Sequence, residues 1–303
     1  MSKQVDSDKA AALYAAALSE ISSSIIHQAL GYFSTIEPNQ LVKNPDRYFE
    51  NWFEMIDEAR QNTWQLGQTY YRLDTAIWTG TTPDDGSGEV LSLKDLWKLF
   101  LKLIGLSKFK SSLPNSDIEL TDPVWEAYDR NYSRRNAAAT FYTRAVHRLK
   151  KFEDANRKDM DADEYLSRFE EVMKSVGNDM ARESQRLTQN GGRDAVLQGA
   201  QNTQGRRIGY MRVPQGSYTC GFCIMLSSRG AVYPTKGSAG FQGVGREYHP
   251  GCDCAIRAFY EGQTEPKAVQ DAKDAWKSYT RTHGSMKASD FVKWWKNRKG
   301  ENG

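Results

Sequence analysis

Apolar residues recur at helical spacing through most of the first 190 positions, and this pattern predicts long helices. From Asp8 to about Phe33 an apolar side chain follows every three or four positions, and Ser7 is the candidate N-cap. A second long helix is expected to begin at Asn44-Pro45 and to end near Gly80. Further helices are expected over residues 92–103, 124–151 and 157–189. The N-terminal half is therefore expected to be helical.

The pattern changes after Gly191-Gly192, which we expect to end the helix of residues 157–189. A short helix is expected from Asp194 to about Thr203. Apolar and polar residues then alternate over residues 208–214 and 255–259, which predicts two strands. Helical spacing returns after Pro266. A small α+β module is thus expected between helical segments.

These elements predict a mainly α fold with three parts. They are an N-terminal helical domain over residues 1–155, a small α+β module over 156–262 and a C-terminal helical tail over 263–303. A mean hydropathy of −0.70 favours long exposed helices over a compact enzyme. The 41 Lys and Arg residues against 38 Asp and Glu give a net charge of +3, which argues against a strongly basic nucleic-acid coat. No apolar run is long enough for a membrane span, and the N-terminus lacks the apolar run of a signal peptide.

All four cysteines lie within one short segment. Cys220-Gly-Phe-Cys223 is followed by His249-Pro-Gly-Cys252-Asp-Cys254. A CxxC pair in a tight turn can place two thiolates on one metal ion, and a distant HxxC pair can supply the other half of a tetrahedron. Five donors therefore compete for four positions. We predict a structural zinc site made of Cys220, Cys223, His249 and either Cys252 or Cys254.

Other interpretations of the cysteines fit less well. Two disulfides are typical of small secreted folds, a thioredoxin-like pair needs a strand-to-helix context, and four unrelated thiols would not cluster. A closed four-ligand site does not activate water, so no catalytic residue and no cofactor-binding residue other than the metal ligands is predicted. Asp253 and Glu247 are nearby carboxylates without a supporting spacing. His27, His147 and His283 lie on predicted helices and are expected at the surface or at an interface, not among the ligands.

The cysteine segment resembles a known family of phage proteins. The run from Cys220 to Tyr233 and the closing Tyr248-His-Pro-Gly-Cys-Asp-Cys254 are similar to the MuF-like minor head proteins of tailed bacteriophages, in the variant found in phages of actinobacteria. The resemblance implies a virion component that associates with the portal vertex during head assembly and lies inside the capsid. It also implies metal binding by the five Cys and His residues. In some phages such proteins leave the capsid with the DNA.

We therefore expect a phage minor capsid or head morphogenesis protein that acts by binding in head assembly and in DNA packaging or ejection. It is not expected to be an enzyme. It would be found in the virion, and in the host cytoplasm during assembly. The alternative is a metal-dependent nuclease or an ADP-ribosyltransferase-like effector delivered with phage DNA, which would need an open metal position or a nucleotide pocket. A cellular DNA-binding protein would call for a larger positive charge than +3.

The expected partners are the portal protein and other head proteins, with oligomers formed only through virion assembly. Packaged DNA is a further candidate, through the basic helix of residues 124–151 and the run Lys293-Trp-Trp-Lys-Asn-Arg-Lys299. The helix of residues 45–80 carries more aromatic side chains than one isolated helix can bury, and this excess predicts contact with a partner.

Overall fold

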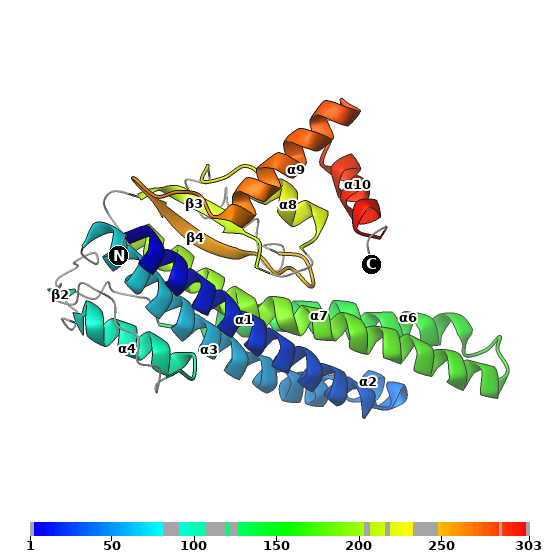
Figure 1. The fold of residues 1–303 in the computed structure, drawn as a ribbon. Helices are drawn as coiled ribbons and strands as arrows, with labels where there is room; N and C mark the ends of the chain where they lie inside the picture. The colour runs from blue at the N-terminus through cyan, green and yellow to red at the C-terminus, as the bar shows by residue number, and fades with distance from the viewer. Residues whose placement is uncertain are drawn as a thin grey trace.

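The computed structural model describes residues 3–80, 91–106, 119–120, 127–202, 207–215, 219–232, 248–284 and 287–300. The long helices α1 (Lys3–Ser34), α3 (Pro45–Thr79) and α7 (Ala162–Asn202) form an elongated bundle (Figure 1). A small β-sheet lies on one end of this bundle, with α8, α9 and α10 above it. The prediction of a mainly α fold is confirmed.

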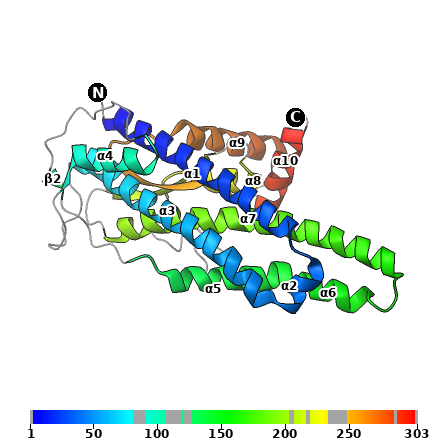
Figure 2. The same cartoon turned by 90° about the horizontal axis from the view of Figure 1, so that it is seen from below.

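Shorter elements complete the bundle. They are α2 (Pro38–Lys43), α4 (Leu93–Leu103), α5 (Arg130–Phe141), the π-helical turn η1 (Tyr142–Val146) and α6 (His147–Asn156). Helices α5 and α6 run along the bundle beside α3 and α7 (Figure 2). Strands β1 (Leu91–Ser92) and β2 (Glu119–Leu120) form a short antiparallel pair next to α4. Among the described residues, every helix lacks an apolar stretch long enough to cross a membrane.

Local signals placed several helix ends correctly. Pro45 lies in the first turn of α3, and Gly80 ends that helix in a left-handed conformation with φ of 79°. Ser92 caps α4, because its hydroxyl accepts a hydrogen bond from the Asp95 amide at 3.1 Å. The expected cap at Ser7 was wrong. The helix begins at Lys3, and Ser7 is buried inside the fold.

The predicted helix over residues 124–151 begins later and ends later than expected. Asp129 is its N-cap and accepts a hydrogen bond from the Tyr132 amide at 2.8 Å. The helical path then continues through η1 to Asn156. Residues 124–126 of the predicted helix lie outside the described residues.

Gly191 and Gly192 do not end a helix, because α7 continues without interruption from Ala162 to Asn202. The two expected helices of this region are therefore one. The glycines mark the crossing of α7 with α1 and α3. A Cβ atom on Gly192 would lie 2.5 Å from the Tyr14 hydroxyl, and one on Gly191 would overlap the carbonyl oxygen of Arg60. Glycine is used here to allow the close approach of helices.

The aromatic side chains of α3 are accommodated within the chain itself. Trp52 is fully buried, and its indole N–H donates to the Ser184 hydroxyl on α7 at 2.9 Å. Tyr70 is buried and stacks on Tyr14 of α1 with a centroid distance of 4.3 Å, while Tyr71 is 1 % exposed. The bundle core therefore accommodates much of the aromatic excess of this helix, while Trp64 and Trp78 are partly exposed, and contact of this helix with a partner stays a prediction.

Strands β3 (Arg207–Val213) and β4 (Ala255–Tyr260) pair antiparallel and confirm both predicted strands. Arg257 on β4 ties this sheet to the bundle. Its guanidinium donates to the Ser7 hydroxyl at 2.5 Å and to Asp8 at 3.0 Å. Ser7 in turn donates to the buried Asp74 carboxylate of α3. This buried polar network joins α1, α3 and β4. The division into three domains stays a prediction.

Helices α8 (Gly221–Ser227), α9 (Lys267–His283) and α10 (Ala288–Gly300) surround an aromatic cluster centred on Phe291, which is fully buried. Trp294 and Trp295 pack on this cluster, and Lys293 and Lys296 are exposed. Helix α10 also lies directly against the start of α8. The Trp295 indole N–H donates to the carbonyl oxygen of Thr219 at 3.0 Å. The predicted C-terminal tail thus packs on the segment that carries the first two cysteines.

Candidate metal centre

The first two cysteines lie at the beginning of α8. Cys220 is the N-cap, and its sulfur accepts a hydrogen bond from the Cys223 amide at 3.4 Å. Both side chains therefore point to the same end of the helix. An added Cβ on Gly221 would lie 2.9 Å from Cβ of Trp295, so the close packing of α10 on α8 requires glycine at position 221.

The other three candidate ligands lie in the turn that leads into β4. The Cys252 amide donates to the carbonyl oxygen of His249 at 3.1 Å, and this bond closes the turn. Gly251 has a φ of +74°, which favours glycine at this position. Cys254 directly precedes the first residue of β4. The turn thereby presents His249 and Cys252 toward the start of α8.

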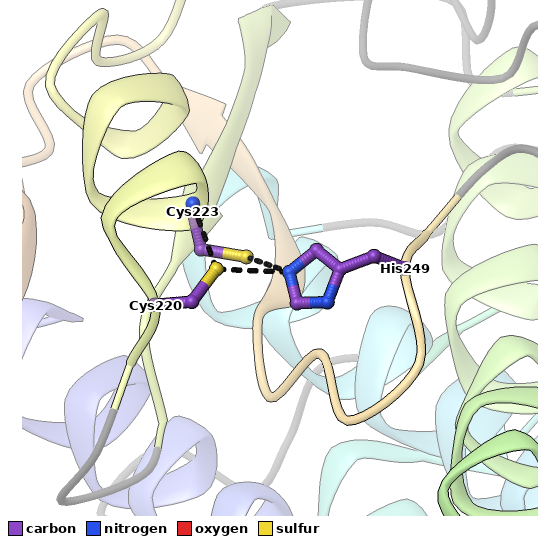
Figure 3. A group of neighbouring side chains, drawn as sticks. All are labelled: Cys220, Cys223 and His249. Carbon is purple, nitrogen blue, oxygen red and sulfur yellow. Dashed lines mark hydrogen bonds between the residues drawn. The ribbon is translucent and has the colours of Figure 1, made fainter. Parts of the chain in front are cut away.

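His249 points its Nε2 atom between the two cysteines of α8 (Figure 3). This atom lies 2.9 Å from Sγ of Cys220 and 3.3 Å from Sγ of Cys223. On the other side of the ring, Nδ1 lies 2.9 Å from the carbonyl oxygen of Pro250. A proton on Nδ1 would donate to that oxygen and leave the lone pair of Nε2 facing the sulfurs. This is the usual arrangement of a metal-binding histidine.

Two groups of donor atoms share Cys223. In each of the groups Cys220–Cys223–His249 and Cys223–Cys252–Cys254, all ligand atoms lie within 4.8 Å of one another. The Sγ atoms of Cys223 and Cys252 are 3.3 Å apart. All four cysteines are free thiols, so the structure contains neither of the disulfides considered from the sequence. All five predicted ligands therefore come together at one place.

The donor set fits a zinc ion. Zn–S bonds of about 2.3 Å and Zn–N bonds of about 2.0 Å place the ligand atoms of a tetrahedron roughly 3.5–3.8 Å apart. The two distances of 3.3 Å lie just below this range, and the distance of 2.9 Å between Sγ of Cys220 and Nε2 of His249 lies further below it. Thiolate and imidazole are ligands that zinc prefers. Cys252 and Cys254 both remain candidates for the fourth position.

Hydrogen bonding shifts the pKa values of Cys220 and His249 in opposite directions. The hydrogen bond with the Cys223 thiol and, to a smaller extent, that with His249 together lower the pKa of Cys220 to about 5, against the opposing effect of burial. The hydrogen bond with Cys220 raises the pKa of His249 to about 9. Without a metal ion these shifts favour a Cys220 thiolate beside a protonated His249, and metal binding requires that His249 lose the proton from Nε2. Because the thiolate is the metal-binding form of cysteine, this environment prepares Cys220 for a cation.

A layer of buried residues lies behind the donor atoms, and sequence reasoning missed it. Arg193 on α7 and Arg212 on β3 are each 2 % exposed. Their guanidinium carbons lie 3.8 Å and 4.4 Å from the ring centroid of Tyr248, the residue before His249. Arginine is usually a surface residue, and no motif spacing marks these two. The only available signal was the position of Tyr248 next to a predicted ligand.

The remaining candidates from the sequence lie elsewhere. His27, His147 and His283 are exposed on α1, α6 and α9 and belong to neither donor group. Asp253 accepts a hydrogen bond from the Thr219 hydroxyl at 2.7 Å. Glu247 lies outside the described residues.

A model of the VG15 protein family matches residues 124–282, slightly more than half of the chain. The matched segment includes α5, the whole of α7, the sheet of β3 and β4, and all five candidate metal ligands. No curated protein and no solved structure matches the chain.

Proposed function

The chain belongs to the VG15 family, a family of phage proteins, and from this premise we propose that it is a minor capsid protein of the phage head. It would associate with the portal inside the capsid and act in head assembly and in DNA packaging or ejection. The observation that carries the proposal is the place of the family match. It includes the cysteine segment that resembles the MuF-like minor head proteins.

We further propose that the Cys and His cluster holds one structural zinc ion. Cys220, Cys223, His249 and one of Cys252 or Cys254 would bind it. The bound ion would join the beginning of α8 to the turn before β4, two segments that are separated by 25 residues of intervening chain. Four protein ligands leave no open position for water. A closed site supports action by binding, without catalysis.

Packaged DNA is proposed as a partner through the C-terminal helices alone. Residues 267–300 contain nine Lys and Arg residues and three Asp residues, whereas the whole chain has a net charge of +3. Lys293 and Lys296 are exposed, and among the described residues neither forms an ion pair. The basic helix over residues 124–151 is less suitable. Its Arg134 and Arg148 already bind Glu50 of α3 and Asp179 of α7.

The test of the head-protein proposal is made in the phage. A nonsense mutation in this gene should yield particles that assemble or package DNA poorly, as counted by electron microscopy, and the wild-type gene should restore them. Mass spectrometry of purified virions should detect the chain in few copies, and a tagged chain should co-purify with the portal protein. Normal particle yield together with absence of the chain from virions would contradict the proposal.

The DNA contact is tested separately on the purified protein. Replacing Lys293 and Lys296 by alanine should weaken binding to duplex DNA of arbitrary sequence. It should also reduce the slope of the logarithm of the binding constant against the logarithm of the salt concentration by about 2, since each phosphate contact contributes about 0.9. The control replaces Arg134 and Arg148, which are paired within the protein. An equal effect of both double variants would refute the assignment to α10.

A further inference from the structure

One arginine of the helical bundle holds the backbone of the turn that carries the candidate ligands. Nε of Arg193 donates to the carbonyl oxygen of Cys254 at 2.9 Å, and Nη2 donates to that of Cys252 at 2.9 Å. The same guanidinium also donates to the side-chain oxygens of Gln189 at 2.7 Å and Asn190 at 2.9 Å. A side chain from α7 thereby fixes both ends of the Cys252-Asp253-Cys254 segment.

Within the described part of the chain, Arg193 forms no ion pair with a carboxylate. Among the described residues, the buried Arg60 and Arg186 each bind an acid, Asp194 and Glu183 respectively, both at 2.6 Å. Arg193 is equally buried, and within the same residues it contacts neutral oxygens and the ring of Tyr248. A buried cation without a counter-charge is strongly unfavourable. A nearby anionic group is therefore expected.

The cysteine cluster supplies such a group when it binds a divalent metal. Three thiolates and one imidazole around a divalent cation carry a net negative charge. The Cys252 and Cys254 carbonyls that Arg193 holds belong to residues whose sulfurs lie in the cluster. Arg193 and the centre are thus placed to neutralise each other.

We propose that Arg193 is a positioning residue of the metal centre, which supplies its counter-charge and couples metal binding to the docking of the turn on α7. The inference rests on the zinc site proposed above. It follows that loss of the metal leaves Arg193 buried without a counter-charge and loosens the turn from the bundle. Equally, loss of Arg193 weakens metal binding although it contributes no ligand atom.

The experiment compares three variants of the full chain. Arg193→Met removes the charge and the hydrogen bonds at similar volume, and Arg193→Lys keeps the charge but cannot hold two carbonyls in the same way. Arg186→Met is the control, because it removes a buried arginine from the same helix, two turns earlier, that is paired with Glu183. Zinc affinity is measured by competition with a chromophoric chelator, and helix content by circular dichroism.

Arg193→Met is expected to weaken zinc binding roughly 10–100-fold, the effect that outer partners of metal ligands usually have. Arg193→Lys should lose less, and Arg186→Met should bind zinc as wild type does. Wild-type affinity in Arg193→Met, or an equal loss in Arg186→Met, overturns the proposal. If Arg193→Met does not fold, Arg193→Gln removes the charge with a smaller change in polarity, and wild-type affinity in that variant overturns the proposal instead.

The same measurement distinguishes this inference from the proposals on which it rests. A wild-type chain that binds no zinc removes the metal site and this inference together. Zinc binding that is equally tight in wild type and Arg193→Met removes the inference alone. Neither result bears on the head-protein proposal, which is tested in the virion.

Discussion

Replacement of Gly191 by alanine should destabilise the protein, although alanine is the better helix former. Gly191 lies in α7 where this helix crosses α3, and a Cβ atom would overlap the backbone oxygen of Arg60 and the hydroxyl of Thr63. A backbone oxygen cannot rotate away as a side chain can. The two helices would have to separate locally to restore ordinary van der Waals contact.

The magnitude follows from opposing contributions. Alanine gains about 1 kcal/mol over glycine within a helix. Overpacking of a close contact costs about 1–3 kcal/mol. Two hydrogen bonds cross the same interface, from Thr63 to the carbonyl of Thr188 at 2.5 Å and from Arg60 to that of Leu187 at 2.7 Å. Their weakening adds about 1 kcal/mol each. The net loss of stability is therefore about 2–4 kcal/mol.

The assay is urea unfolding followed by far-UV circular dichroism, with Gly31→Ala as the matched control. Gly31 is an exposed residue inside α1, and nothing lies within 4 Å of an added Cβ. This control should gain about 0.5–1 kcal/mol, because only the helix propensity changes. If Gly191→Ala proves as stable as wild type, the close helix crossing is not a constraint and the reasoning fails.

Three further results are expected. Glu50→Gln should make the free energy of unfolding depend less on pH in the acid range, because the hydrogen bond with Arg134 lowers the pKa of Glu50 below its ordinary 4.5. The stabilisation by Glu50 is complete above pH 4.5 and is lost as the pH falls through the lowered pKa. A variant that keeps the wild-type slope of stability against pH would contradict this. Gly221→Ala should displace α10 from α8, measured as a red shift and quenching change of tryptophan fluorescence near Trp295, and an unchanged spectrum would count against this packing. When zinc is present at a hundred times its Kd, removing it with a chelator should lower the free energy of unfolding of the wild type by about 2.7 kcal/mol. The same treatment should leave the free energy of unfolding of Cys223→Ser unchanged, and an equal loss in both proteins would contradict a metal site.

Much of the helical framework could be predicted from the sequence because its signals are local. Apolar spacing located α1 and α3, and Pro45, Gly80 and Ser92 marked their ends or the next start. The spacing of the cysteines and His249 also predicted that these residues meet, which the structure shows. Which four of them bind a metal stays a prediction.

The errors arose where distant contacts override local signals. Gly191-Gly192 resembles a helix end in isolation, but in the fold the missing side chains make room for Arg60 and Tyr14. The neighbours on α1 and α7 that bury Tyr70 and Trp52 of α3 could likewise not be identified from the sequence. Arg193 could not be recognised for the same reason, since its partners lie about 60 positions away.

The network of Ser7, Asp74 and Arg257 sets an order of events during synthesis. Ser7 is made 250 positions before Arg257. At a translation rate of about 5–20 residues per second, roughly 10–50 s pass between the synthesis of Ser7 and that of Arg257. During that interval Asp74 has no arginine beside it, so its burial in the completed bundle is delayed. The first helices can form early, but the bundle reaches its final packing only after β4 has left the ribosome.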